Sequence, residues 1–293
     1  METILTSIAV LLRILSNPLG NVYQKQLTAN GVHPLIVNFI TYGLLAFACI
    51  FIGLIIDWPL LPYQFWLFSL LGGMAGALGN GFLVKALQKG DLSILGPVNS
   101  YKSVVGLVFG IFLLGEIPNV WGILGMILII YGSYFVLDTM EEGFSWELLK
   151  RKEIQYRIWA MILTAIEAVF IKKIILASST TIAFISWCCF GALFSLILLM
   201  ANRSQLGKET FTGKHFDYQR YLLLIICIGT MQYTTNYAFE HMPVGYALSL
   251  FQLSIIISVL LGHKIFKEQD IRKKLIGSVI MIIGSVLVIL LKD

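Results

Sequence analysis

The chain has 293 residues, of which 58% are hydrophobic and 13% are charged, whereas a soluble domain has roughly 25% charged residues. A soluble fold of this length could not bury so much apolar surface, which excludes a soluble enzyme or binding domain. The net charge of +5 is spread over predicted loops and does not indicate nucleic-acid binding.

Apolar blocks follow one another along the chain, each ending at a charge, a proline or a short polar turn. About 20 residues of helix cross ~30 Å of hydrocarbon. Backbone groups at that depth must be paired within the segment, which predicts helices rather than barrel strands. We therefore expect an all-α integral membrane protein of about ten transmembrane helices, with a retained first span rather than a signal peptide. The predicted spans are residues 4–26, 34–56, 63–87, 92–115, 118–137, 157–176, 180–201, 220–240, 243–265 and 270–291.

An internal repeat relates the third to fifth predicted spans to their counterparts in the second half. A shift of 152 residues superposes Ala86 on Ala238, Gly110 on Gly262, Glu116 on Glu268, Gly125 on Gly277, Gly132 on Gly284 and Ser133 on Ser285. We predict a first five-helix repeat over 1–137, a linker over 138–156 and a second repeat over 157–293. Because five is odd, the second repeat would be inverted in the membrane, as in many secondary transporters with a substrate site between their halves.

Four features of the sequence carry a likeness to a known family: Ala86-Leu87, Leu114-Gly115-Glu116, the spacing of Gly125 and Gly132, and the series Glu268, Gly277, Gly284. In these features the chain resembles the drug/metabolite transporter superfamily, specifically its ten-span EamA-type permeases. The resemblance implies a carrier that moves amino acids, sugars, nucleotide derivatives or other metabolites, often outward, without ATP hydrolysis. That family often has a proline about fourteen residues before each glutamate, but here Lys102 and Ser254 stand at those positions.

Lys102 is the first candidate site residue, because an ionisable group at the centre of a span costs about 2.5–3.5 kcal/mol on insertion scales. Asn99 shares its predicted helix face, and Gly106 and Gly110 continue that face at helical spacing. We therefore expect Lys102 to point into the bundle and to meet an anionic group of a substrate. The alternative is a structural ion pair with Glu167 that meets no ligand.

Glu167 lies near the centre of the sixth predicted span, where burial favours the neutral carboxyl and a neighbouring cation favours the carboxylate. It is the candidate proton carrier, and a static salt bridge to Lys102 or Arg13 is the alternative. Arg13 starts a polar face of the first span that continues through Asn17 and Asn21. That arginine could line a cavity or extend towards the near membrane surface.

Further polar side chains are predicted to contribute to substrate binding: Asn80, Tyr101, Tyr233, Asn236, Tyr237 and Gln252. Hydrogen bonding between helices is the alternative for each of them. Glu116 and Glu268 lie in predicted turns, where a carboxylate beside a helix N-terminus is stabilising, so we assign them to architecture.

The predicted function is secondary active transport of small polar metabolites such as amino acids by alternating access, with export favoured and proton coupling as an option. The alternatives are a membrane-embedded enzyme and a non-transporting structural membrane protein. Against an enzyme, the four histidines form no metal-ligand or acid/base motif, and no nucleophile elbow is present. We expect no cofactor and no metal, a small-molecule substrate, and a monomer or homodimer in the cell membrane.

The distribution of basic residues predicts the orientation. Lys and Arg residues outside the predicted span centres lie in or beside the loops after odd-numbered spans, apart from Lys172, Lys173 and Lys292. Positive residues stay cytoplasmic, which would place both termini outside. The resemblance implies both termini inside, and we favour the charges because they belong to this chain.

Overall fold

The computed structural model describes residues 2–102, 104, 119–137, 147, 150–202, 217–242 and 244–290. Within these ranges every regular element is a helix. The helices are α1 (Glu2–Ala29), α2 (Pro34–Gly53), α3 (Tyr63–Lys89), α4 (Leu92–Val98), α6 (Val120–Leu137), α8 (Lys152–Ala177), α9 (Thr180–Ala201), α10 (Tyr218–His241), α11 (Val244–Phe251), α12 (Ser254–Phe266) and α13 (Ile271–Leu290).

Seven helical segments of the described ranges are long and apolar enough to cross a membrane. They are Thr3–Ala29, Pro34–Gly53, Tyr63–Lys89, Val120–Leu137, Thr180–Ala201, Tyr218–His241 and Ala247–Phe266. The prediction of an all-α membrane protein is confirmed at this level. Much of the predicted span 92–115, including Gly106, Gly110 and the Leu114-Gly115-Glu116 motif, lies outside the described residues, as does most of the linker.

The distribution of side chains is that of a protein dissolved in lipid. Large apolar residues are exposed along the outward faces of the long helices, for example Leu11 and Leu15 on α1 and Phe47 and Phe51 on α2. Polar groups such as Asn38 and Asn236 are instead fully buried. Hydrocarbon therefore replaces water as the solvent of the outer face.

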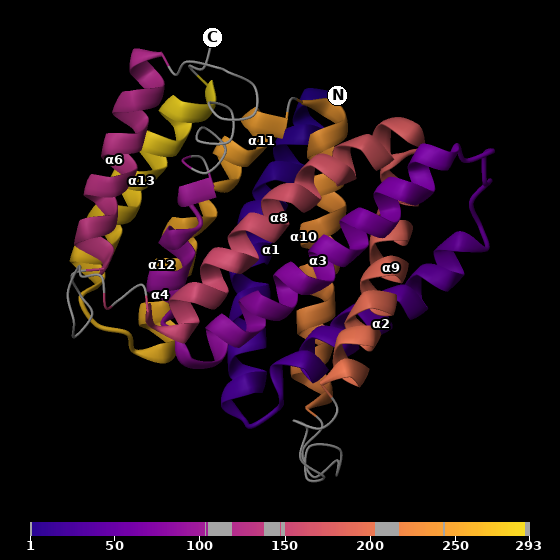
Figure 1. The fold of residues 1–293 in the computed structure, drawn as a ribbon, viewed down its shortest axis with the longest axis horizontal. Helices are drawn as coiled ribbons and strands as arrows, with labels where there is room; N and C mark the ends of the chain where they lie inside the picture. The colour runs from indigo at the N-terminus through magenta and orange to yellow at the C-terminus, as the bar shows by residue number, and fades with distance from the viewer. Residues whose placement is uncertain are drawn as a thin grey trace.

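Helices of the first half pack mainly on helices of the second half (Figure 1). The largest contacts join α3 to α8, α6 to α13, α1 to α10 and α2 to α9, and α4 packs on α12. The beginning of α1 and the end of α13 lie at the same edge of the molecule (Figure 1). The two predicted repeats therefore pack against each other through most of their helices.

Glycines set the contact between α6 and α13. A Cβ on Gly132 would lie 2.7 Å from the carbonyl oxygen of Gly277, and a Cβ on Gly284 would lie 2.6 Å from that of Gly125. Only residues without a side chain allow this approach. Gly125 lies next to Gly284, and Gly132 lies next to Gly277. Residue numbers therefore increase along α6 in the direction in which they decrease along α13, so the two helices are antiparallel.

Local chemistry fixes where several helices begin and end. His33 caps α2 through its Nδ1, which accepts a hydrogen bond from the Leu35 N–H at 3.3 Å, and Pro34 occupies the first turn. At the end of α12, Lys267 adopts a left-handed conformation with φ of 58°. That turn lets the Glu268 N–H bond back to the Gly262 carbonyl at 3.3 Å and directs the chain into α13.

Candidate substrate cavity

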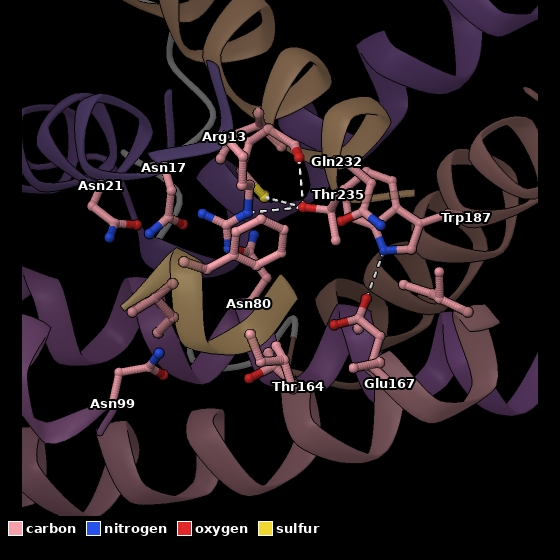
Figure 2. A pocket seen from close by; sticks show the side chains of 18 of the residues that line it. Arg13, Asn17, Asn21, Asn80, Asn99, Thr164, Glu167, Trp187, Gln232 and Thr235 are labelled. Atoms are coloured by element: carbon pink, nitrogen blue, oxygen red, sulfur yellow. Dashed lines mark hydrogen bonds between the residues drawn. The ribbon is translucent and has the colours of Figure 1, made fainter. Parts of the chain in front are cut away.

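A cavity of about 130 Å³ lies between helices of both halves. Its polar lining comes from α1, α2, α3, α8, α9 and α10 and from the residues that follow α4. The polar and charged side chains are Arg13, Asn17, Asn21, Tyr42, Asn80, Asn99, Lys102, Arg157, Thr164, Glu167, Trp187, Gln232 and Thr235. Figure 2 shows Glu167 and Trp187 at one end of this cavity and Asn21 and Asn99 at the other.

Glu167 is closely packed against neighbouring residues at its end of the cavity. Trp187 Nε1 donates a hydrogen bond of 2.6 Å to its Oε1 (Figure 2), and the residue is 8% exposed. On α3, a side chain at position 76 would collide with this carboxyl and would approach the Tyr42 hydroxyl. Gly76 therefore makes the room that Glu167 occupies, and Trp187 holds one of its two oxygens.

Arg13 points into the bundle rather than towards the membrane surface. Its Nε donates to Thr235 Oγ1 at 2.8 Å (Figure 2), and its guanidinium carbon lies 4.8 Å from the centre of the Phe251 ring. Its Nη1 is buried and has no hydrogen-bond partner among the residues that the structure describes. A buried donor of a charged group normally has an acceptor, so this nitrogen has unused bonding capacity beside the cavity.

The chain breaks its helical pattern next to the cavity in both halves. After α4, the N–H groups of Asn99, Ser100 and Lys102 bond three residues back, at 2.9–3.1 Å. Between α11 and α12, Gln252 and Leu253 do the same at 3.1 Å. With the 152-residue shift Asn99 falls on Phe251, so the breaks match. Helices interrupted at corresponding positions of two repeats are a common location of transporter substrate sites.

Arg157 connects α8 to the first of these breaks. Its Nε donates to the Leu95 carbonyl oxygen at 2.7 Å, and the residue is 7% exposed. This carbonyl has lost its usual helical donor, because the Asn99 N–H bonds to Gly96 instead. The arginine thus satisfies a backbone acceptor while its guanidinium borders the cavity.

The structure places five of the predicted site residues in the cavity lining, namely Arg13, Asn80, Asn99, Lys102 and Glu167. Asn80 also links helices, because its Nδ2 donates to Asn38 Oδ1 at 2.6 Å and its Oδ1 accepts from Gln24 at 3.1 Å. Among the described residues, no acceptor hydrogen bonds to Lys102 Nζ and no ion pair within 4.0 Å joins it to Glu167.

The other predicted site residues lie outside the lining. Tyr101 donates to Ser133 Oγ at 2.6 Å, and Asn236 is fully buried against Gln232. Tyr233 is 40% exposed and contacts Thr181 at 3.4 Å, while Tyr237 stacks on His241 with ring centres 4.1 Å apart. Gln252 is buried at the second helix break.

Several lining residues were not among the predicted site residues. The sequence does point to Asn17 and Asn21, because they share the polar face of the first span with Arg13. Arg157 stood at the edge of a predicted span, where a cation usually meets water. Tyr42, Trp187 and Thr235 looked like ordinary helix residues, and only packing brings them to the cavity.

Glu268 forms a second polar cluster, which we call the Glu268 network. Its carboxylate accepts hydrogen bonds from Lys25 Nζ at 2.9 Å and from the N–H groups of Leu92 and Ser93, both at 2.8 Å. Asp91 adds ion pairs to Lys25 at 4.0 Å and Lys274 at 3.9 Å. Lys25 lies one turn beyond the cavity residue Asn21 on α1.

The Glu268 network therefore ties α1, the start of α4 and the α12–α13 turn together. Burial alone would raise the pKa of Glu268, but the Lys25 charge and the hydrogen bonds from Ser93 and Lys25 hold it below its usual range. The sequence predicts that Glu268 stabilises a helix N-terminus. In the structure that helix is α4, which belongs to the other half of the chain. Glu116, its predicted counterpart, lies outside the described residues.

Known proteins show a family and a fold to which this chain is similar. The model of the EamA-like transporter family matches twice, over residues 5–138 and 152–290. Relatives from Streptococcus pyogenes serotypes M1, M3 and M6, each named "Putative sugar uptake protein", are 25% identical in an alignment of 278 residues, and the alignment covers 86% of this chain and 88% of each relative. A protein crystal structure with 15% identity aligns over 98% of this chain and 97% of its own with a TM-score of 0.63, which shows a shared fold.

Proposed function

The chain belongs to the EamA-like transporter family, and we propose that it carries small polar metabolites across the cell membrane by secondary active transport. Both the family and the names of the relatives point to a transporter rather than an enzyme. The observation that carries the proposal is the cavity itself. It is buried among membrane-spanning helices, is lined by charged and amide side chains, and receives residues from both halves.

The proposed architecture is ten spans in two inverted repeats. Three observations support it. The family model matches each half once, the helix breaks fall at matching positions, and the glycine contacts are reciprocal. In the structure Gly125 contacts Gly284 and Gly132 contacts Gly277. The 152-residue shift instead aligns Gly125 with Gly277 and Gly132 with Gly284. Such reciprocity between antiparallel helices is the mark of a two-fold axis perpendicular to them, which is the symmetry that inverted repeats require.

We further propose that Lys102 contacts an anionic group of the substrate. A cation in a membrane interior is retained when it has a partner or a use, and Lys102 has no hydrogen-bond acceptor among the described residues. Amino acids meet this requirement through their carboxylate. The relatives' names instead suggest sugars, and the amides of Asn17, Asn21, Asn99 and Gln232 suit hydroxyl groups as well as carboxylates.

The cavity also limits the size of the substrate. Its volume of about 130 Å³ is below the roughly 300–1,000 Å³ of pockets that hold drug-sized ligands. The occupant is therefore a small metabolite, and other states of the transport cycle would open the cavity further. The resemblance favours export, whereas the relatives are named for uptake, so the direction must be measured.

Reconstituted protein in liposomes tests the proposal. We expect accumulation of at least one labelled small polar metabolite under counterflow, without ATP and without conversion to a product. Lys102→Met should reduce binding at least tenfold, and Lys102→Arg should restore it in part, because a planar guanidinium does not replace a compact ammonium. Tyr233→Phe, on the exposed face, is the matched control. Product formation in detergent without transport would identify an enzyme and refute the proposal.

A further inference from the structure

The cavity lining carries an excess of positive charge. Among the described residues that border it, Arg13, Lys102 and Arg157 are cationic, and Glu167 supplies the single carboxyl. Arg13 comes from α1 and Arg157 from α8, the first helix of each half. The positive charge is therefore contributed from both sides of the proposed two-fold axis.

No carboxylate of a described residue compensates these three cations within 4.0 Å. Arg13 bonds to a hydroxyl and packs on an aromatic ring. Arg157 bonds to a backbone carbonyl. All of these partners are neutral, so they provide hydrogen-bond or packing contacts but do not compensate the positive charges. Removing an ion from water is costly even after relaxation, and within the described ranges Arg13 Nη1 has no acceptor.

The total charge of the described lining residues is counted here with Lys102 protonated and Glu167 ionised. Arginine stays protonated in proteins. In that state the described lining carries two net positive charges, and moving the proton from Lys102 to Glu167 leaves this sum unchanged. A ligand with two negative charges would bring this sum to zero.

We propose that the substrate of this cavity is a small dianion, held between Arg13 and Arg157 with Lys102 beside them. This inference rests on the proposed transport function and narrows its substrate class. Dicarboxylates and phosphate monoesters share the chemistry, since arginine binds both carboxylate and phosphate through paired N–H donors. A dianion cancels the lining charge, whereas a neutral sugar or a zwitterion leaves it in place.

The test uses full-length protein in liposomes and compares succinate, inorganic phosphate, lactate, alanine and glucose as competitors and as counterflow substrates at pH 7.5. We expect succinate or phosphate to compete at least tenfold better than lactate. Competition by succinate alone identifies the dicarboxylate class, and by phosphate alone the phosphoryl class.

Charge-changing variants supply the second arm. Arg157→Gln lowers the lining to one net positive charge, so the dianion-to-lactate preference should fall about tenfold. Arg157→Lys should keep it. Lys172→Gln removes a positive charge outside the lining, where that lysine bonds to the Phe239 carbonyl, and should change nothing. A preference ratio does not depend on how much protein is folded, so instability of a variant cannot imitate the result.

Two outcomes overturn the inference. If glucose or alanine is transported and neither dianion competes, transport stands and the dianion class is wrong. If Arg157→Gln keeps the full preference for a dianion, Arg157 does not set the charge of the site.

Discussion

Replacement of Glu268 by Gln is the sharpest test of how the two halves are held together. The substitution keeps the size of the side chain and one acceptor oxygen. It removes the charge that faces Lys25 and the two N–H groups at the start of α4. Glu268 is 7% exposed and the Lys25 side chain 13%, so water can only partly replace the lost interaction.

The magnitude follows from that burial. Removing one partner of a buried ion pair costs about 3–5 kcal/mol. Lys25 keeps Asp91 at 4.0 Å as a second carboxylate, so we expect a loss of about 2–4 kcal/mol. At about 2–4 °C per kcal/mol for large domains, the Tm should fall by roughly 4–16 °C.

The dependence on pH gives an independent check. Because the pKa of Glu268 is lower in the folded protein than in the unfolded chain, its contribution is complete above the ordinary value of about 4.3 and disappears as pH falls through the folded value. The difference in Tm between wild type and Glu268→Gln should therefore be constant from neutral pH to about 5 and shrink at lower pH.

Thermal unfolding of the purified protein in detergent measures both effects. The matched control is Glu240→Gln at the end of α10, whose carboxylate is 41% exposed and accepts one hydrogen bond from Thr180. We expect that control to lose at most about 1 kcal/mol. If Glu268→Gln loses no more than Glu240→Gln, the network does not hold the halves together and our reasoning fails.

Three further predictions concern the proton carrier, the helix interface and the orientation. If transport is proton-coupled, Glu167→Gln should abolish the pH dependence of uptake and retain part of the exchange activity; an unchanged pH profile would remove Glu167 from the mechanism. Gly132→Ala should destabilise the protein by about 1–3 kcal/mol because its Cβ would collide with α13, whereas Gly43→Ala, with only the Phe39 ring at 4.0 Å, should be neutral in the same thermal assay. In a variant whose native cysteines are replaced, an impermeant maleimide applied to intact cells should label Asp57→Cys but not Asn30→Cys, and the reverse pattern would show that the family orientation, not the charge distribution, is correct.

The sequence by itself determined the class of this protein. Apolar blocks of span length leave no soluble alternative, and the paired motifs around Gly125 and Gly277 identify the family. The candidate cation Lys102 and the candidate carboxyl Glu167 could also be found, because charge inside an apolar block is costly whatever surrounds it. Such signals depend on composition and local spacing, which need no knowledge of packing.

Only the tertiary structure decided which polar groups meet. Residues four apart share a helix face, so Gln232 lies with Asn236 and Tyr233 with Tyr237, but this spacing does not say which face turns inwards, because a tyrosine suits both lipid and protein. Gln232 borders the cavity and Tyr233 is exposed. Arg157 reaches the Leu95 carbonyl and Glu268 reaches the start of α4 from distant parts of the chain. Contacts between residues so far apart arise from how helices cross, and periodicity within one helix carries no information about that crossing.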